Sequence, residues 1–124
     1  MTEKILEIVP TPVWGGGEQY VYDISAELMK AGKKVCVCCK KTADPEDYTF
    51  QRFSALKPQR IERVSFRSKF SPSAIRTMAT LIREERIDLV HTHVFTDAFI
   101  ALAARKRYHL DTRIIMTRDR KSVV

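Results

Sequence analysis

Short apolar segments alternate with amphipathic helical segments along the whole chain, and this alternation restricts the possible folds more than any other feature. The predicted strands are Lys4–Val9, Lys34–Cys39, Ile61–Phe66, Ile87–His93 and Thr112–Thr117. The predicted helices between them are Gly17–Ala31, Asp44–Lys57, Pro72–Arg86 and Asp97–Tyr108. Strands that alternate with helices of this length form right-handed βαβ units around a parallel sheet. We therefore predict an α/β fold, a Rossmann-like parallel sheet of about five strands in the order 3-2-1-4-5 with helices on both faces.

Local signals mark where three of these helices begin or end. Gly32 stands where the first helix should end, because glycine readily adopts the left-handed conformation that helix ends need. Ser71 can cap a helix whose first residue is Pro72, where the missing N–H of proline is harmless. Thr96 is predicted to cap the last helix in the same way.

Length and composition indicate one globular domain. The chain has 124 residues, of which 44% are hydrophobic and 30% charged. This length suits a single domain, residues 1–124, and excludes a complete TIM barrel. The apolar runs are too short to span a membrane, and charges at Glu3, Lys4 and Glu7 interrupt any signal-peptide core. The three cysteines are crowded into residues 36–39, which is no disulfide framework, so we expect a cytoplasmic protein.

The net charge of +7 is concentrated in two basic blocks. Residues 48–76 carry seven basic side chains and one acidic one, and residues 101–124 carry seven basic and two acidic ones. Such blocks attract phosphates, acidic lipid headgroups or nucleic acid. No helix-turn-helix or RNA-binding motif accompanies them, so we expect no nucleic-acid partner.

Two hypotheses remain for the first basic block, a solvated basic face and a peripheral contact with an anionic membrane surface. Its aromatic residues are Phe50, Phe53, Phe66 and Phe70, and they alternate with Arg52, Lys57, Arg63, Arg67 and Lys69. Basic side chains bind anionic bilayers, and phenylalanines on an amphipathic helix can insert into them. The second hypothesis places the protein at the inner face of the membrane.

A candidate site follows from the predicted strand order. In such a sheet the direction of strand addition reverses between the first and fourth strands, and ligands bind at the carboxyl ends of the strands there. The loops that follow these strands, residues 10–17 and 91–96, are also the two most unusual stretches of the sequence. Gly15, Gly16 and Gly17 precede a helix, so a phosphate or a sugar hydroxyl could approach the backbone and the free helix N–H groups. The alternative for these glycines is a flexible turn, and the dinucleotide fingerprint GxGxxG is absent.

The histidine pair at the end of the fourth strand is the second candidate feature. His91 and His93 lie two residues apart in a strand, so their side chains share a face. A zinc site would need a third ligand, and the possible helpers, Asp97, His109 and Asp119, have no diagnostic spacing. We therefore predict no metal and no other cofactor. His91 is expected to be a satisfied core histidine, and His93, at the strand end, is the better candidate for contacting a ligand.

For Trp14 and the three cysteines, packing in the protein interior is one possible role. Trp14 precedes the glycines and is either a ligand-stacking platform or an apolar plug over the sheet edge. Cys36 and Cys38 share one face of a strand, and Cys39 points to the other. Cysteine is among the most buried residue types, so we expect all three to pack in the core.

Two segments together resemble family 4 of the retaining glycosyltransferases, which have the GT-B fold. The opening KILEIVPTPVWGGGEQYVYDISAELMKAGKKVCVCC is similar to that family's first strand, Gly-Gly loop, amphipathic helix and second strand. The segment IDLVHTHVFTDAFIALAAR is similar to its His-x-His strand and the small-residue helix that follows. The resemblance follows nearly the whole chain, and residues 43–70 are its weakest stretch.

The resemblance implies an enzyme that transfers a sugar from a nucleotide-sugar donor to a sugar or lipid-linked acceptor, with retention of the anomeric configuration. It implies that this chain is the N-terminal, acceptor-side domain, and that the nucleotide-sugar domain lies beyond residue 124, so the chain alone is inactive. By position, Gly15–Gly17 match the loop near the donor phosphates and the acceptor, and His93 matches a histidine that faces the cleft. Trp14, Thr96 and Asp119 complete the acceptor-side candidates, and Asp119 stands where the family usually has a histidine. No catalytic residue is assigned within this chain.

The alternative is a stand-alone flavodoxin-like binding or signalling module, which would explain the length without a second domain. A phosphoacceptor version would need an acidic pair after the first strand, where this chain has Val9 and Pro10. The reading frame after Val124 would discriminate, because a second Rossmann-like unit favours the enzyme and a stop codon favours the module.

Overall fold

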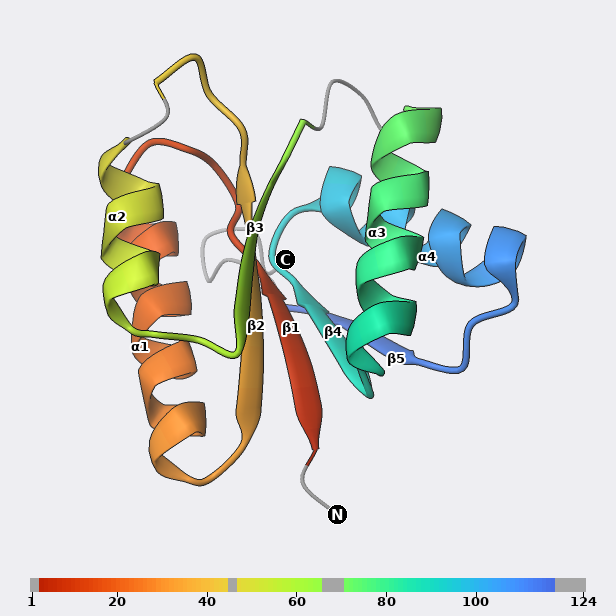
Figure 1. The fold of residues 1–124 in the computed structure, drawn as a ribbon. Coiled ribbons are helices and arrows are strands. Elements are labelled where there is room, and N and C mark those ends of the chain that lie inside the picture. The colour runs from red at the N-terminus through yellow and green to blue at the C-terminus, as the bar shows by residue number, and fades with distance from the viewer. Residues whose placement is uncertain (1–2, 45–46, 66–70, 118–124) are drawn as a thin grey trace, which may run out of the picture.

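Five parallel strands form one sheet in the order β3-β2-β1-β4-β5 in the computed structural model of the chain, as predicted (Figure 1). The structure describes residues 3–44, 47–65 and 71–117. The strands are β1 (Lys4–Ile8), β2 (Lys34–Lys40), β3 (Arg60–Val64), β4 (Leu89–Thr92) and β5 (Arg113–Met116). The helices are α1 (Gly16–Lys30), α2 (Tyr48–Ala55), α3 (Pro72–Glu85) and α4 (Phe95–Tyr108). The fold is therefore the predicted α/β, Rossmann-like sheet.

Helices cover both faces of the sheet, with α1 and α2 on one face and α3 and α4 on the other (Figure 1). Successive residues of a strand point to opposite faces, so each buried strand contributes to two cores. Cys36 and Cys38 pack with Met78 in the core under α3 and α4. Cys39 packs with Val37 in the core under α1 and α2. The predicted division of the three cysteines between the two faces is confirmed.

The central strand β1 pairs with β2 on one side and with β4 on the other. Leu6, Ile8 and Val9 are completely buried, as expected for a parallel strand with helices on both faces. Because all the strands are parallel, the loops that follow them gather at one edge of the sheet, which we call the carboxyl edge. Strand addition reverses between β1 and β4, so the loops after these two strands meet where sheets of this kind bind ligands.

Two of the predicted helix boundaries are confirmed. Gly32 follows α1 with a φ of +86°, the left-handed conformation expected of a glycine at a helix end. Ser71 caps α3, because its side-chain oxygen accepts a hydrogen bond from the backbone N–H of Ala74. No helix within the described residues is long and apolar enough to cross a membrane.

The prediction that Thr96 caps α4 is wrong. The N-cap is Val94, whose side chain accepts no hydrogen bond, and Thr96 lies exposed in the first turn. The acidic side chain of this turn is Asp97, whose carboxylate interacts favourably with the positive end of the helix dipole. The helix begins at Phe95, earlier than the predicted start at Asp97.

Candidate functional site

The start of α1 and the end of β4 lie side by side at the carboxyl edge. The ring of Tyr20, in the second turn of α1, packs edge-on against the ring of His93, with 6.0 Å between their centroids and 83° between their planes. The two stretches that the sequence marks as candidates, the glycine loop with its helix and the His-x-His segment, are thus brought together. The contact arises because α1 lies on the same face of the sheet as His93.

Beneath this contact, Glu7 forms a buried cluster with both histidines. Glu7 lies opposite His91 in the register of β1 and β4, and its side chain is completely buried. Its Oε2 pairs with Nδ1 of His91 at 2.9 Å, and its Oε1 pairs with Nε2 of His93 at 3.0 Å. Nε2 of His91 hydrogen-bonds the hydroxyl of Thr117. His91 is therefore a satisfied core histidine, as predicted.

The carboxyl group of Glu7 is ionised at neutral pH. Burial acts to raise the pKa of Glu7, but hydrogen bonds from His91 and His93, together with their charges, lower that pKa below its ordinary value. An ionised carboxylate only accepts hydrogen bonds, so the imidazole nitrogens that face it must carry protons. The sequence analysis did not find Glu7, although a single acid inside an otherwise apolar central strand was a signal for it.

Within the described residues, Glu7, His91 and His93 are also the group that could hold a metal ion. Each offers one ligand atom, and these three atoms lie within 4.8 Å of one another. The three residues that the sequence offered as further ligands lie elsewhere or are otherwise engaged. Asp97 instead pairs with Lys40, His109 ends α4 at its other end, and Asp119 lies outside the described residues. In the hydrogen-bonded arrangement the imidazoles direct N–H groups at the carboxylate. A metal would need lone pairs there, and so would have to displace both protons.

The glycine loop is held by a carboxylate that the sequence analysis also missed. Glu18 is buried in the first turn of α1, and its Oε2 accepts hydrogen bonds from the backbone N–H of Thr11 at 3.1 Å and from its hydroxyl at 2.8 Å. Gly15 is the N-cap, and a Cβ there would lie 3.4 Å from Oε1 of Glu18. A Cβ at Gly16 would meet no other described residue within 4 Å. The packing of the chain therefore leaves open space beside the helix start at Gly16.

Trp14 packs in an aromatic cluster rather than standing free. Its ring lies 5.6 to 5.8 Å from the ring centroids of Tyr22, Tyr48 and Phe53. The guanidinium carbon of Arg52 lies 4.8 Å from the centroid of Trp14 and 4.7 Å from that of Tyr22. Of the two alternatives for Trp14, this packing favours the apolar plug.

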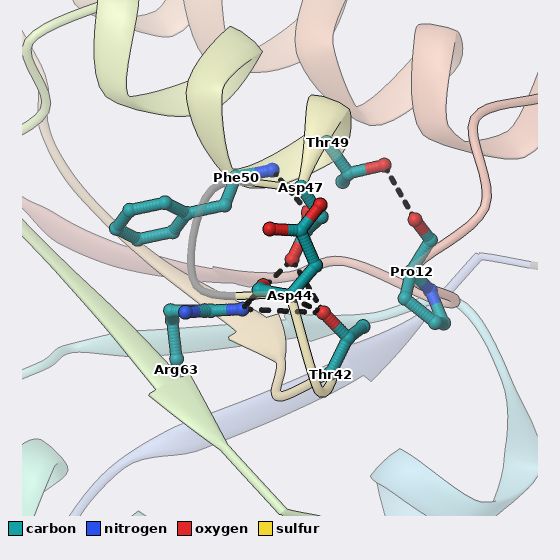
Figure 2. A network of polar contacts seen from close by, with 7 residues as sticks. All are labelled: Pro12, Thr42, Asp44, Asp47, Thr49, Phe50 and Arg63. Atoms are coloured by element: carbon teal, nitrogen blue, oxygen red, sulfur yellow. Dashed lines mark hydrogen bonds and ion pairs between the residues drawn. The ribbon is translucent and has the colours of Figure 1, made fainter.

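A polar network fixes α2 against both of its neighbours (Figure 2). Asp47 caps α2 by accepting a hydrogen bond from the backbone N–H of Phe50 at 2.8 Å, and it also accepts one from Arg63 of β3 at 2.9 Å. The hydroxyl of Thr49 donates to the carbonyl of Pro12 at 2.8 Å. The helix is thus tied to β3 on one side and to the glycine loop on the other.

The basic block around α2 is in part internal structure. Phe53 is completely buried, so it belongs to the core and cannot insert into a membrane. Arg63 lies 4.9 Å from the ring centroid of Phe50 while it pairs with Asp47, and Arg52 lies among aromatic rings. Phe66, Arg67, Lys69 and Phe70 lie outside the described residues.

A shallow cleft of about 400 Å³ opens at the carboxyl edge. It is lined by the loop after β1, the ends of β2 and β3 and the start of α4, through Pro10, Thr11, Pro12, Lys40, Lys41, Ser65, Val94, Thr96 and Asp97. Thr96 is among the residues that line this cleft, whereas Trp14 and His93 are not. Asp119, the remaining acceptor-side candidate, lies outside the described residues.

Lys40 and Asp97 form an ion pair at the wall of this cleft. Asp97 is completely buried, and the side chain of Lys40 is 14% exposed. Burial raises the pKa of Asp97 and lowers the pKa of Lys40, and the attraction between the two charges opposes both changes. The pair links the end of β2 to the start of α4.

The cysteines take no part in this site. Burial raises the pKa of Cys36 to about 11 and that of Cys39 to about 12, and it raises the pKa of Cys38 as well. The thiolate is the reactive form of cysteine, so these thiols are unreactive at neutral pH.

The parallel sheet with helices on both faces defines a Rossmann-like domain. The family model described as Glycosyltransferase Family 4 matches residues 14–118 of the chain. The chain therefore belongs to glycosyltransferase family 4. Comparison with curated protein sequences gives no match.

Solved structures with the same fold include enzymes and a protein described only as conserved. A glycosyltransferase from Rickettsia africae matches with a TM-score of 0.70 and 18% identity, over 93% of this chain and 29% of that one. The conserved protein TT1542 from Thermus thermophilus matches with a TM-score of 0.70 and 13% identity, over 100% of this chain and 69% of that one. Leucoanthocyanidin reductase from Vitis vinifera, solved with NADPH, matches with a TM-score of 0.56 and 18% identity, over 90% of this chain and 34% of that one. The chain thus spans less than a third of the Rickettsia glycosyltransferase, and these likenesses concern the fold.

Proposed function

We propose that this chain forms the acceptor-side half of the cleft of a retaining glycosyltransferase. The reaction would transfer a sugar from a nucleotide-sugar donor to a sugar or lipid-linked acceptor. The observation that carries the proposal is the contact between Tyr20 of α1 and His93 after β4, within a family 4 domain. This contact joins the glycine loop and the His-x-His segment at the point where the strand order reverses.

The start of α1 is suited to phosphate or hydroxyl groups of the substrates. A helix N-terminus offers unpaired N–H groups and the positive end of the helix dipole. Open space at Gly16 lets a ligand approach that backbone.

A second Rossmann-like domain would supply most of the contacts to the nucleotide sugar. This chain alone should therefore be inactive, with nucleotide affinity in the millimolar range or weaker, a binding free energy of roughly −4 kcal/mol. We also propose that no metal is needed on this half of the cleft, since Glu7 is already engaged by the two imidazoles.

The test is an assay of a protein that contains this chain together with its second domain. UDP-, GDP- and ADP-sugars are supplied in turn, and both transfer and donor hydrolysis are measured, with and without EDTA. We expect one donor class to react, with the anomeric configuration retained and with no loss in EDTA. An absence of transfer and hydrolysis with every donor would contradict the proposal, and an inverted product would contradict the retaining mechanism.

A further inference from the structure

We propose that Glu7 is a positioning residue that fixes the proton of His93 on Nε2, so that Nδ1 of His93 is a hydrogen-bond acceptor for a ligand hydroxyl. The inference rests on the proposed function for the identity of the ligand, a sugar or another polyol at the carboxyl edge. The assignment of the protons rests on the geometry of Glu7, His91 and His93 alone.

The carboxylate of Glu7 divides its two oxygens between the two imidazoles. Oε2 faces Nδ1 of His91, and Oε1 faces Nε2 of His93. A neutral imidazole carries one proton, on either ring nitrogen, and an ionised carboxylate can only accept. When both rings are neutral they are therefore held in opposite tautomers, with the proton on Nδ1 in His91 and on Nε2 in His93.

The remaining nitrogens of the two rings differ in their surroundings. In His91 the bare Nε2 accepts the hydrogen bond of the Thr117 hydroxyl, so both nitrogens of this ring are used inside the protein. In His93 the bare Nδ1 has no hydrogen-bond partner within the described part of the chain. It is not one of the buried side-chain atoms that lack a hydrogen-bond partner, so this nitrogen is not fully buried. Among the described residues, His93 therefore keeps an acceptor that no other side chain uses, at the carboxyl edge beside Tyr20.

The chemistry of this acceptor selects the kind of group that it can bind. A lone pair backed by a buried negative charge attracts a hydroxyl proton and repels a phosphate or a carboxylate. The start of α1, in contrast, favours anions. The two sides of the Tyr20–His93 contact are thus complementary, one suited to phosphate and the other to a neutral hydroxyl.

The first test reads the tautomers directly, by long-range ¹H–¹⁵N correlation spectra of the imidazoles in this chain at pH 8. We expect a bare Nδ1 in His93, a protonated Nδ1 in His91, and a mixture of tautomers in the exposed His109. In Glu7→Gln one acceptor oxygen becomes an amide donor, so one of the two buried rings must change its tautomer. Thr117→Val is the matched control, and it should leave His93 unchanged. A protonated Nδ1 in wild-type His93, or no change of either ring in Glu7→Gln, would overturn the inference.

The second test asks what Nδ1 binds. Glycerol, glucose and myo-inositol are titrated to high concentration, and inorganic phosphate is titrated in parallel. We expect at least one polyol to shift the Nδ1 resonance of His93 and phosphate to leave it in place. If phosphate alone shifts it, or no polyol does, the ligand assignment is wrong.

The third test uses the active two-domain protein. In His93→Gln the side-chain amide can still donate to Glu7, but nothing replaces Nδ1, so we expect about a tenfold or larger loss of kcat/KM for the acceptor with donor hydrolysis retained. Wild-type acceptor kinetics in this variant would contradict the role of Nδ1. The tautomers can be read whether or not any donor reacts. Expected tautomers without activity would therefore contradict the proposed function alone, and unexpected tautomers in an active enzyme would contradict this inference alone.

Discussion

Lys40, at the end of β2, and Asp97, in the first turn of α4, form an ion pair although 57 residues separate them in the chain. The pair connects elements on the two sides of the central strand β1. Because Asp97 is completely buried, its negative charge depends on the nearby Lys40 more strongly than the charge of an exposed acid would.

Replacement of Lys40 should therefore destabilise the folded protein strongly. We expect Lys40→Met to lower the free energy of unfolding by about 3 kcal/mol, because Asp97 is left as an uncompensated buried charge. A second change, Asp97→Asn, should restore part of the loss. The matched control is Arg113→Met, which removes the more exposed pair with Glu3 and should cost less than about 1 kcal/mol. Urea unfolding measures all four proteins, and equal losses in Lys40→Met and Arg113→Met would contradict the prediction.

Stability at acid pH should depend on Glu7. Its pKa in the folded protein is lowered below the ordinary value of 4.5, so the stability linked to this group is present above pH 4.5 and is lost as the pH falls through the folded pKa. The difference in unfolding free energy between wild type and Glu7→Gln should therefore shrink as the pH falls below 4.5. Asp47→Asn serves as the control, because it removes a different carboxyl of lowered pKa and should leave the Glu7-linked part intact. A difference independent of pH would rule out this linkage.

The residue that caps α2 should contribute more to the free energy of unfolding than the residue that caps α3, because it also makes a second interaction. Asp47→Ala removes both the helix cap and the pairing with Arg63, and we expect a loss of about 2 kcal/mol. Ser71→Ala removes a cap alone and should cost about 1 kcal/mol. Asp47→Ser keeps a capping oxygen without the charge and should cost less than Asp47→Ala. Thermal or urea unfolding measures the three variants, and equal losses in Asp47→Ala and Ser71→Ala would show that the Arg63 contact adds nothing.

Two glycines should respond in opposite ways to alanine. Gly16 begins α1 with open space around it, so Gly16→Ala should keep or raise stability by up to about 1 kcal/mol. Gly32 has a φ of +86°, and Gly32→Ala should cost about 1 kcal/mol through backbone strain. In the active two-domain protein, we expect Gly16→Ala to reduce turnover although the fold is intact, because a methyl group enters the space where we propose that the ligand approaches. Full turnover in Gly16→Ala would show that the glycine serves only as a turn.

Membrane association can be tested by co-sedimentation with vesicles that contain or lack anionic lipid. Each basic side chain near an anionic bilayer contributes about 1 kcal/mol, so the double variant Arg67→Glu and Lys69→Glu should bind anionic vesicles less than wild type. Arg63 is kept, because it pairs with Asp47 inside the fold. The control is Lys33→Glu and Lys34→Glu, a matched charge change at the other edge of the sheet, which should have little effect. Equal binding to both kinds of vesicle would leave the solvated basic face as the correct hypothesis.

The order of the elements could be predicted because it depends on local patterns. The apolar periodicity of α1 and the stops and starts at Gly32 and Ser71 act within a few residues of the chain. The right-handedness of βαβ units then restricts the sheet to few topologies. Thr96 shows the limit of such reasoning, because the N-cap of α4 is Val94, and the acid of its first turn, Asp97, pairs with a lysine from another strand.

The sequence by itself determined the α/β fold, the family, and the edge of the sheet where His93 and the glycine loop lie. These follow from periodicity and from short motifs, which need no knowledge of the distant neighbours of a residue. Only the tertiary structure decided that Glu7 joins the two histidines, that Trp14 packs with Arg52, and that Asp97 pairs with Lys40. Each of these contacts depends on strand register or on helix packing, which bring together side chains up to 86 residues apart. The energy of a buried charge or hydrogen bond depends on those neighbours, so no local pattern could reveal it.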